Sequence, residues 1–412
     1  MMPSQFAPAI RRYWKTLVVV AFSGVLFSTV GFAQTGIQNM KPEDAGGQKL
    51  SESHRYGRDD PNYVQNMHHF IHAMPKAELH VHYEGTLAPT KILALSKRNG
   101  TPGIPDTIDG IKKMLAGSVL TQFLAGLAKA RSTMVTEQDF YEVAWEFAVR
   151  QMENQVVYTE LMFDPQGHTS RGIEFDTFMR ALVRAKQDAK DILGIRIELS
   201  MQFHRDKSRA SALETLADAE RWKDHILGVG MDNGPQAGYA EKLQPAMEKA
   251  RAMGFHISGH IDRYELDYDK NLNFLLNTLK VGRVDHGINI MDTPELIPVA
   301  RDRAVTFTVC GATLYSDNLN LYEDSGFKLY TRRIDEMTKA GLQTTINTDD
   351  PGYFIGFYLS DMIRAFYEEN QYSKEELIDF QRRAFLGAWM SEKDKALYLA
   401  QLAQYARDTG TK

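Results

Sequence analysis

Two histidines spaced two residues apart offer the first recognisable chemistry in this chain. In the segment Ala77–Gly85, the apolar residues Leu79 and Val81 alternate with His80 and His82. Alternation with a period of two indicates a β-strand, on which residues two apart point to the same face. Two imidazoles side by side supply half of a metal site. Two structural histidines would give the same pattern, so the rest of the chain must supply the missing ligands.

Eight short apolar segments alternate with helical patterns, and these are the elements that must position the histidines. A βα alternation repeated eight times predicts an α/β protein with a closed (β/α)8 barrel. Several helical patterns between residues 89 and 153 separate the first two strands, so we expect extra helices that form a lid or wall after strand 1. After the opening strand, the expected strands are 156–163, 195–203, 226–231, 255–259, 283–286, 305–310 and 342–347.

An open, doubly wound sheet is the alternative architecture for this alternation of strands and helices. Its phosphate-binding signature would be G-x-G-x-x-G after a strand. The chain instead has Gly228, Gly230 and Gly234, which are spaced G-x-G-x-x-x-G. The barrel is therefore the preferred prediction.

Polar residues gather where the expected strands end, and a barrel carries its active residues at those carboxyl ends. His260 ends strand five, Asp285 and His286 end strand six, and Asp349 and Asp350 follow strand eight. Three imidazoles and one carboxylate suit Zn²⁺, which leaves a position for a water whose pKa falls to about 7. A further histidine can orient the hydroxide, and a second carboxylate can accept its proton. The pattern predicts hydrolysis at an electron-poor carbon.

Three segments resemble the adenosine/adenine deaminase family of metal-dependent aminohydrolases, and they occur in family order: Met74–His82, Arg283–Gly287 and Ile346–Pro351. The resemblance covers roughly residues 70 to 390. It implies one Zn²⁺ per chain, held by His80, His82, His260 and Asp349. It also implies that His286 positions the zinc-bound water and that Asp350 lies next to the purine.

The same resemblance implies a small-molecule purine substrate, a 6-aminopurine (adenosine or adenine), hydrolysed to the 6-oxopurine and ammonia. Glu84 follows the histidine pair where adenosine-type members usually carry an aspartate for a ribose hydroxyl. The segment 163–172, which includes Asp164, and the segment 350–354 look like the adenine-type branch. Glu84, Asp164 and Asp350 are therefore the expected substrate-binding residues.

The chain departs from the family after strand five, where the family usually has H-A-G-E and its glutamate protonates the purine ring. Here the run is His260–Glu265, and Arg263 occupies the position of the glutamate. The interval to His286 is about two residues longer than in the family pattern, which would carry Glu265 into the acid's place. Asp262 is the second candidate, and loss of the acid is the third possibility. The predicted catalytic residues are Glu265, His286 and Asp350.

Two alternative functions follow from this departure and from the segment 310–314, which lacks the usual Ser-Asn of the family. One is a related barrel aminohydrolase with an altered substrate, such as an N6-substituted purine. The other is a catalytically inactive protein that binds purines. A cytidine-type deaminase is excluded, because it needs P-C-x-x-C and the chain has the single cysteine Cys310.

The composition is that of a globular protein, with 43% hydrophobic and 25% charged residues in 412 and a net charge of −5. The absence of basic runs in the sequence argues against nucleic acid as a partner. One cysteine allows no internal disulfide. The sequence does not indicate an oligomeric state.

The N-terminus has the pattern of a secretory signal peptide. Arg11, Arg12 and Lys15 precede the apolar run 17–32, and small residues lead to an expected cleavage after Ala33. We therefore expect a signal peptide at 1–33, a polar leader arm at 34–66 and the barrel at 67–412. The protein would be exported, periplasmic or secreted, with no membrane attachment after cleavage; an uncleaved anchor is the alternative.

Overall fold

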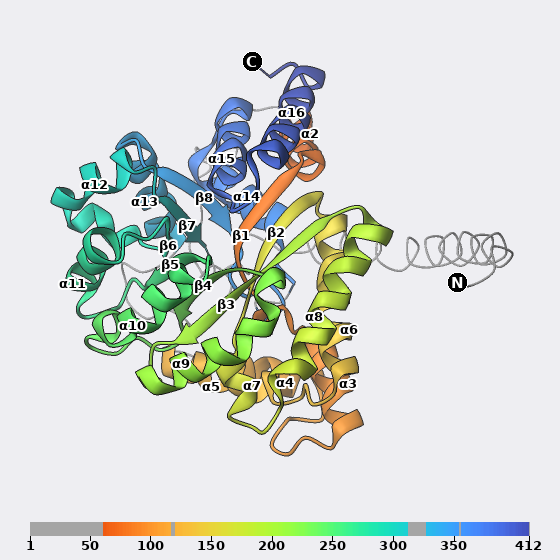
Figure 1. Ribbon diagram of the computed structural model, residues 1–412. Coiled ribbons are helices and arrows are strands. Elements are labelled where there is room, and N and C mark those ends of the chain that lie inside the picture. Colours follow the sequence, from red (N-terminus) through yellow and green to blue (C-terminus); the bar gives the residue numbers. More distant parts are fainter. Residues whose placement is uncertain (1–60, 117–119, 312–326, 354–355, 412) are drawn as a thin grey trace, which may run out of the picture. The chain divides into compact units, whose positions relative to one another are not determined.

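Eight parallel strands lie side by side in the order β1 to β8 (Figure 1). The computed structural model describes residues 61–116, 120–311, 327–353 and 356–411. These belong to the second of two units, 1–55 and 56–412. The strands are β1 Lys76–His82, β2 Val156–Phe163, β3 Arg196–His204, β4 Ile226–Asp232, β5 His256–Ile261, β6 Arg283–His286, β7 Thr306–Cys310 and β8 Gln343–Asn347.

The first strand, β1, is hydrogen-bonded to the segment that directly follows the last strand, β8. Val81 forms a parallel bridge with Asp349. The His82 amide donates to the Asp349 carbonyl at 2.8 Å, and the Asp349 amide donates to the His80 carbonyl at 3.1 Å. These bonds make the sheet a nearly closed barrel, so the predicted (β/α)8 architecture is confirmed.

Helices cover the outside of the barrel, as parallel strands require. Every residue of β1 is buried. The helices are α2 Pro61–Ala73, α3 Pro89–Asn99, α4 Ile108–Leu115, α5 Leu120–Arg131, α6 Glu137–Glu153, α7 Pro165–Thr169, α8 Phe175–Asp188, α9 Arg209–Ala219, α10 Tyr239–Ala252, α11 Tyr268–Asn273, α12 Ile297–Asp302, α13 Phe327–Lys339, α14 Leu359–Asn370, α15 Lys374–Gly387 and α16 Glu392–Asp408. None of the helices in the described part of the chain is long and apolar enough to cross a membrane.

Four helices, α3 to α6, lie between β1 and β2 where a βα unit has one, so the expected extra helices after the first strand are present. Local sequence explains where α6 begins, because the Thr136 and Asp139 side chains form a reciprocal capping box. The Tyr353 hydroxyl, in the segment after β8, donates to the Leu115 carbonyl at 2.6 Å. The extra helices are thereby tied to the end of the barrel at which the strands terminate, and α4 and α5 lie together at that end (Figure 1).

The opposite end of the barrel is covered by α2 and the C-terminal helices (Figure 1). Lys76, at the start of β1, is fully buried. Its ammonium group donates to the carbonyls of His72 at 2.9 Å, Met74 at 2.7 Å and Asn154 at 2.8 Å. This lysine therefore joins α2, β1 and the end of α6.

Some predictions fall wholly or partly on residues that the structure does not describe. The expected signal peptide at 1–33 lies outside the described residues, as do most of the leader arm, residues 312–314 after β7 and Phe354. The last six residues of the expected arm, 61–66, form the start of α2.

Candidate active site

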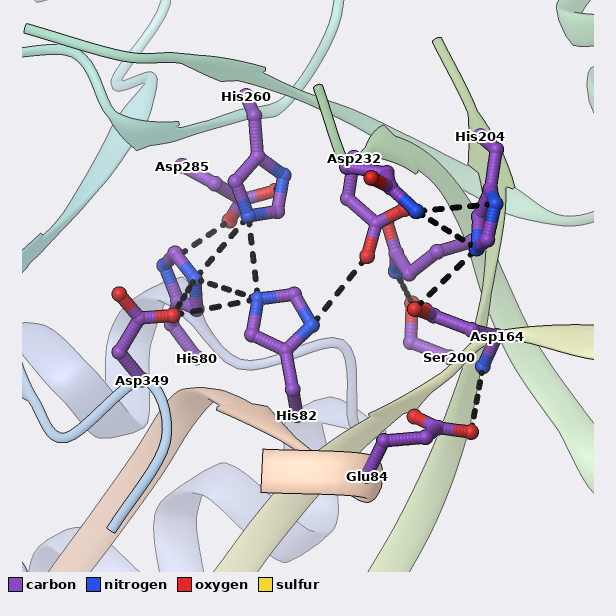
Figure 2. Close-up of polar contacts among 12 residues, drawn as sticks. His80, His82, Glu84, Asp164, Ser200, His204, Asp232, His260, Asp285 and Asp349 are labelled. Atoms are coloured by element: carbon purple, nitrogen blue, oxygen red, sulfur yellow. Dashed lines mark hydrogen bonds and ion pairs between the residues drawn. The ribbon is translucent and has the colours of Figure 1, made fainter. Parts of the chain in front are cut away.

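Three histidine nitrogens converge at the carboxyl end of the barrel (Figure 2). The Nε2 atoms of His80 and His82 are 3.2 Å apart, and that of His260 lies 3.1 Å from the first and 3.3 Å from the second. Asp349 Oδ1 lies 3.4 Å from His80 Nε2 and 3.3 Å from His82 Nε2. The structure thus brings together all four residues expected to hold a metal.

The three separations among the histidines, and the two from Asp349 to His80 and His82, are close to those around a tetrahedral cation. A Zn–N distance of 2.0–2.1 Å implies ligand atoms about 3.3–3.4 Å apart in a tetrahedron. The observed 3.1–3.4 Å is close to that spacing. Burial lowers the pKa of His260 well below its usual value, and His80 and His82 lower it further. A neutral imidazole with a free lone pair is the form that binds a metal.

Hydrogen bonds outside this cluster fix the tautomer of His80. The Thr308 hydroxyl donates to Asp285 Oδ1 at 2.9 Å. It must therefore accept from His80 Nδ1, which lies 3.0 Å away. With its proton on Nδ1, His80 turns a bare Nε2 toward the other ligands, which is the usual arrangement behind a metal-binding histidine.

The other two histidines also face carboxylates with their outer nitrogens. His260 Nδ1 lies 3.5 Å from Asp285 Oδ2, and His82 Nδ1 lies 3.3 Å from Asp232 Oδ2. Asp285 therefore lies behind two ligands: it is hydrogen-bonded to His80 through Thr308, and its charge lies 3.5 Å from His260 Nδ1. Asp232 was not among the residues predicted from the sequence.

His286 lies beside the cluster rather than within it. Its Nε2 is 3.8 Å from Asp349 Oδ2 and 3.9 Å from Asp262 Oδ1. Both His286 and Asp349 have positive φ angles, 56° and 67°. Such angles are uncommon for residues other than glycine and are often found where a side chain must be aimed at a functional site.

Asp350 is buried against the turn that follows β1. A Cβ on Gly85 would lie 1.7 Å from Asp350 Oδ1, so only glycine allows this approach. Oδ1 is buried without a hydrogen-bond partner in the described structure. Burial raises the pKa of Asp350 well above its usual value, and Asp349 raises it further.

The expected substrate residues Glu84 and Asp164 lie next to each other. The Asp164 amide donates to Glu84 Oε1 at 3.1 Å, and His168 Nε2 lies 2.8 Å from the same oxygen. Since Arg171 donates to His168 Nδ1 at 2.9 Å, His168 carries its proton on Nε2 and donates it to Glu84. Burial and the charge of Asp164 raise the pKa of Glu84 to about 8.

Asp164 also pairs with a histidine that the sequence analysis missed. His204 Nε2 lies 3.3 Å from Asp164 Oδ2. Burial disfavours ionisation of Asp164, but the hydrogen bond and charge of His204 outweigh it and lower its pKa. His204 and Asp232 are the last residues of β3 and β4, one residue beyond the ends expected for those strands. Extending the inspection of strand ends to all eight strands would have found both.

The two candidate acids after β5 are both near a buried arginine. Arg205 contacts Asp262 Oδ2 through Nη2, and its Nη1 donates to Glu265 Oε2 at 3.3 Å. Asn271 donates to Glu265 Oε1. Burial raises the pKa of Glu265 to about 7, although Arg205 lowers it. The Arg263 carbonyl accepts from Asn289 at 3.3 Å.

A (β/α)8 barrel in which three histidines and an aspartate gather at the carboxyl ends of the strands is the arrangement expected of a metal-dependent aminohydrolase. The family model described as adenosine deaminase matches residues 75–405. The chain belongs to the adenosine deaminase family and is a hydrolase that deaminates purines, as the resemblance predicted.

Relatives and solved structures agree with this assignment. The chain is 35% identical to an uncharacterized deaminase of Schizosaccharomyces pombe, over 83% of this chain and 99% of that protein. It is 34% identical to an adenine deaminase of Acinetobacter baylyi, over 82% and 99%. The crystal structure of adenine deaminase from Arthrobacter aurescens is 28% identical, with a TM-score of 0.75 over 81% of this chain and 100% of the other. An amidohydrolase from Burkholderia ambifaria with bound zinc is 25% identical, with a TM-score of 0.74 over 83% and 94%.

Proposed function

We propose that this protein catalyses zinc-dependent hydrolytic deamination of a 6-aminopurine, adenine or adenosine. The observation that carries the proposal is the convergence of three histidine nitrogens 3.1–3.3 Å apart, with Asp349 Oδ1 within 3.4 Å of two of them, those of His80 and His82. Adenine deaminases among the relatives support the substrate class. The reaction adds the oxygen of water to C6 and releases the amino group as ammonia.

Four residues would hold one Zn²⁺ per chain: His80, His82, His260 and Asp349. The metal would supply a water that ionises near neutral pH. His286 lies beside Asp349 and is placed to orient the attacking water. Asp350 is buried with one oxygen free, so it can accept a hydrogen bond or proton from that water.

The ring nitrogen beside C6 must gain a proton as the water oxygen attacks. A carboxyl group after β5 is the natural donor, and Asp262 and Glu265 are the two present there. Glu84 and Asp164 would bind the far side of the purine. The His168 hydrogen bond holds Glu84 in place for that contact.

Ammonia release tests this function. Purified, zinc-loaded protein is incubated with adenine and with adenosine, and ammonia is measured by a coupled assay. We expect turnover of at least one of them, and loss of turnover after chelation that zinc restores. Turnover of neither would reject the proposal.

The departure after His260 favours one other substrate class, the N6-substituted purines. Arg263 occupies the position at which the family usually has its glutamate, so the pocket around the ring differs from the family pattern. Release of methylamine from N6-methyladenine, with no ammonia from adenine, would favour this alternative.

We also propose that the protein is exported and cleaved after Ala33. The support is the sequence pattern of basic residues, an apolar run and small residues. Expression with the native N-terminus, followed by mass spectrometry of the protein outside the cytoplasm, would give a mature chain that begins at Gln34. A chain that retains residues 1–33 would reject cleavage.

A further inference from the structure

The turn after β5 presents two carboxylates, and Arg205 lies against both. The Arg205 side chain is only 2% exposed, and it also donates to the carbonyls of Asp232 at 3.1 Å and His260 at 3.4 Å. Its guanidinium lies 5.1 Å from the centre of the Tyr239 ring, and the Tyr239 hydroxyl donates to the His260 carbonyl at 2.7 Å. Arg205 is therefore held from several sides and can serve as a fixed point for the turn.

Both oxygens of Glu265 are already engaged. Oε2 accepts from Arg205 and, at 3.3 Å, from the Asp262 amide, while Oε1 accepts from Asn271. The Glu265 amide in turn donates to the Asp262 carbonyl at 3.2 Å. The Glu265 side chain is 3% exposed. It closes the turn internally and offers no free oxygen to a ligand.

Asp262 has the opposite arrangement. Arg205 contacts its Oδ2, whereas Oδ1 is the oxygen that faces His286 at 3.9 Å. The Asp262 side chain is 19% exposed, close to the 14% of His286 and the 16% of Asp349. These three side chains are more exposed than those of His80 (0%) and His260 (4%), so they are the ones that a substrate can reach from solvent.

We infer that Asp262, rather than Glu265, is the carboxyl group that contacts the purine ring nitrogen beside C6, and that Arg205 and Glu265 are positioning residues for it. The inference rests on the proposed function for the identity of the ligand. This arrangement explains the longer turn after β5. Asp262 is one residue closer to His260 than the family glutamate would be. The Glu265–Arg205 pair holds the turn so that the shorter Asp262 side chain faces the site.

Two matched variants separate the candidates, because Asp262→Asn and Glu265→Gln each replace a carboxyl group by an amide of the same size. With zinc-loaded protein, we expect Asp262→Asn to lower kcat for adenine or adenosine about 10²-fold or more, the scale of a lost proton-transfer group. Glu265→Gln should lower it less than about 10-fold. The reverse order would overturn the inference, and so would equal losses.

Binding of hypoxanthine, the 6-oxopurine formed from adenine, gives a readout that does not need turnover. Its ring nitrogen beside C6 carries a hydrogen, which a carboxylate would accept. Since a hydrogen bond to a charged group exceeds a neutral one by about 1 kcal/mol, we expect the Kd measured by calorimetry to rise about fivefold in Asp262→Asn. It should change less than about twofold in Glu265→Gln. Absence of binding, or an equal change in both variants, would overturn the inference even if the wild type deaminates adenine.

If Arg205 acts by positioning Asp262, the effects of substituting these two residues on kcat should not be additive. Arg205→Lys keeps the charge but loses the two-pronged contact. We expect it to lower kcat in the wild-type background and to have little further effect in Asp262→Asn. A merely structural role would lower kcat by the same factor in both backgrounds. Wild-type protein that releases no ammonia would instead reject the proposed function, and the hypoxanthine titrations would still decide which carboxylate contacts the ring.

Discussion

Asp285 should control the affinity for zinc without binding it. The Asp285→Asn substitution keeps the size of the side chain but removes its charge. It weakens the acceptor for Thr308 at 2.9 Å, which orients His80, and removes the charge that lies 3.5 Å from His260 Nδ1. Loss of one such outer partner typically weakens metal binding about 10- to 100-fold. Because Asp285 lies behind two ligands, we expect about 100-fold, which corresponds to about 2.7 kcal/mol.

A competitive titration against a fluorescent zinc chelator measures this effect. Thr308→Val removes the partner of His80 alone, so we expect a smaller loss of about 10-fold. Asp302→Asn, on an exposed side chain, makes the same charge change away from the site and should leave zinc affinity unchanged. Unfolding curves of the metal-free variants separate misfolding from weaker binding. Zinc affinity in Asp285→Asn within twofold of wild type would refute the orientation argument.

Three further predictions concern single positions. Gly85→Ala should reduce kcat about 10²-fold or more by displacing Asp350, whereas Gly282→Ala, where a Cβ meets nothing within 4 Å, should not; equal kcat in both would contradict it. Lys76→Met leaves three carbonyls without their donor, so the free energy of unfolding in urea should fall by about 3 kcal/mol or more; a loss below about 1 kcal/mol would contradict it. The pKa of Glu265 is about 7 in the folded protein, against a reference value of 4.5 for an unperturbed glutamate. Its contribution to the free energy of unfolding is therefore present below pH 4.5 and is lost as pH rises through 7. The unfolding free energy of wild type should therefore fall relative to Glu265→Gln across that range, by at most about 3 kcal/mol, and parallel curves would contradict it.

The periodicity of the sequence is sufficient to predict the barrel. Strands of a parallel sheet covered by helices are continuous apolar runs, and each is followed by a helical pattern. The same periodicity predicts that His80, His82, His260 and Asp349 lie at one end of the barrel. This prediction depends only on the rule that parallel strands terminate together. The family resemblance then supplied the separate roles of these residues.

The outer shell of the site was harder to predict. His204 and Asp232 each extend a strand by one polar residue, which apolar periodicity does not register. Thr308 looks like an ordinary strand residue, and its role depends on contacts with His80 and Asp285 from two other strands. Such partners are set by barrel geometry, since side chains from different strands meet at distances that sequence spacing does not reveal.

The choice between Asp262 and Glu265 shows the same limit in its sharpest form. Counting residues favoured Glu265, because an insertion of two would carry it to the position of the family glutamate. Counting assumes that an insertion shifts the side chain without changing its partners. That assumption fails here because of Arg205, which follows the last residue of β3. Arg205 donates to Glu265, whereas Oδ1 of Asp262 faces His286. The residue that matches a motif by number is then the one whose oxygens are already occupied, and a free oxygen that a substrate can reach from solvent is the better guide to the group that meets the substrate.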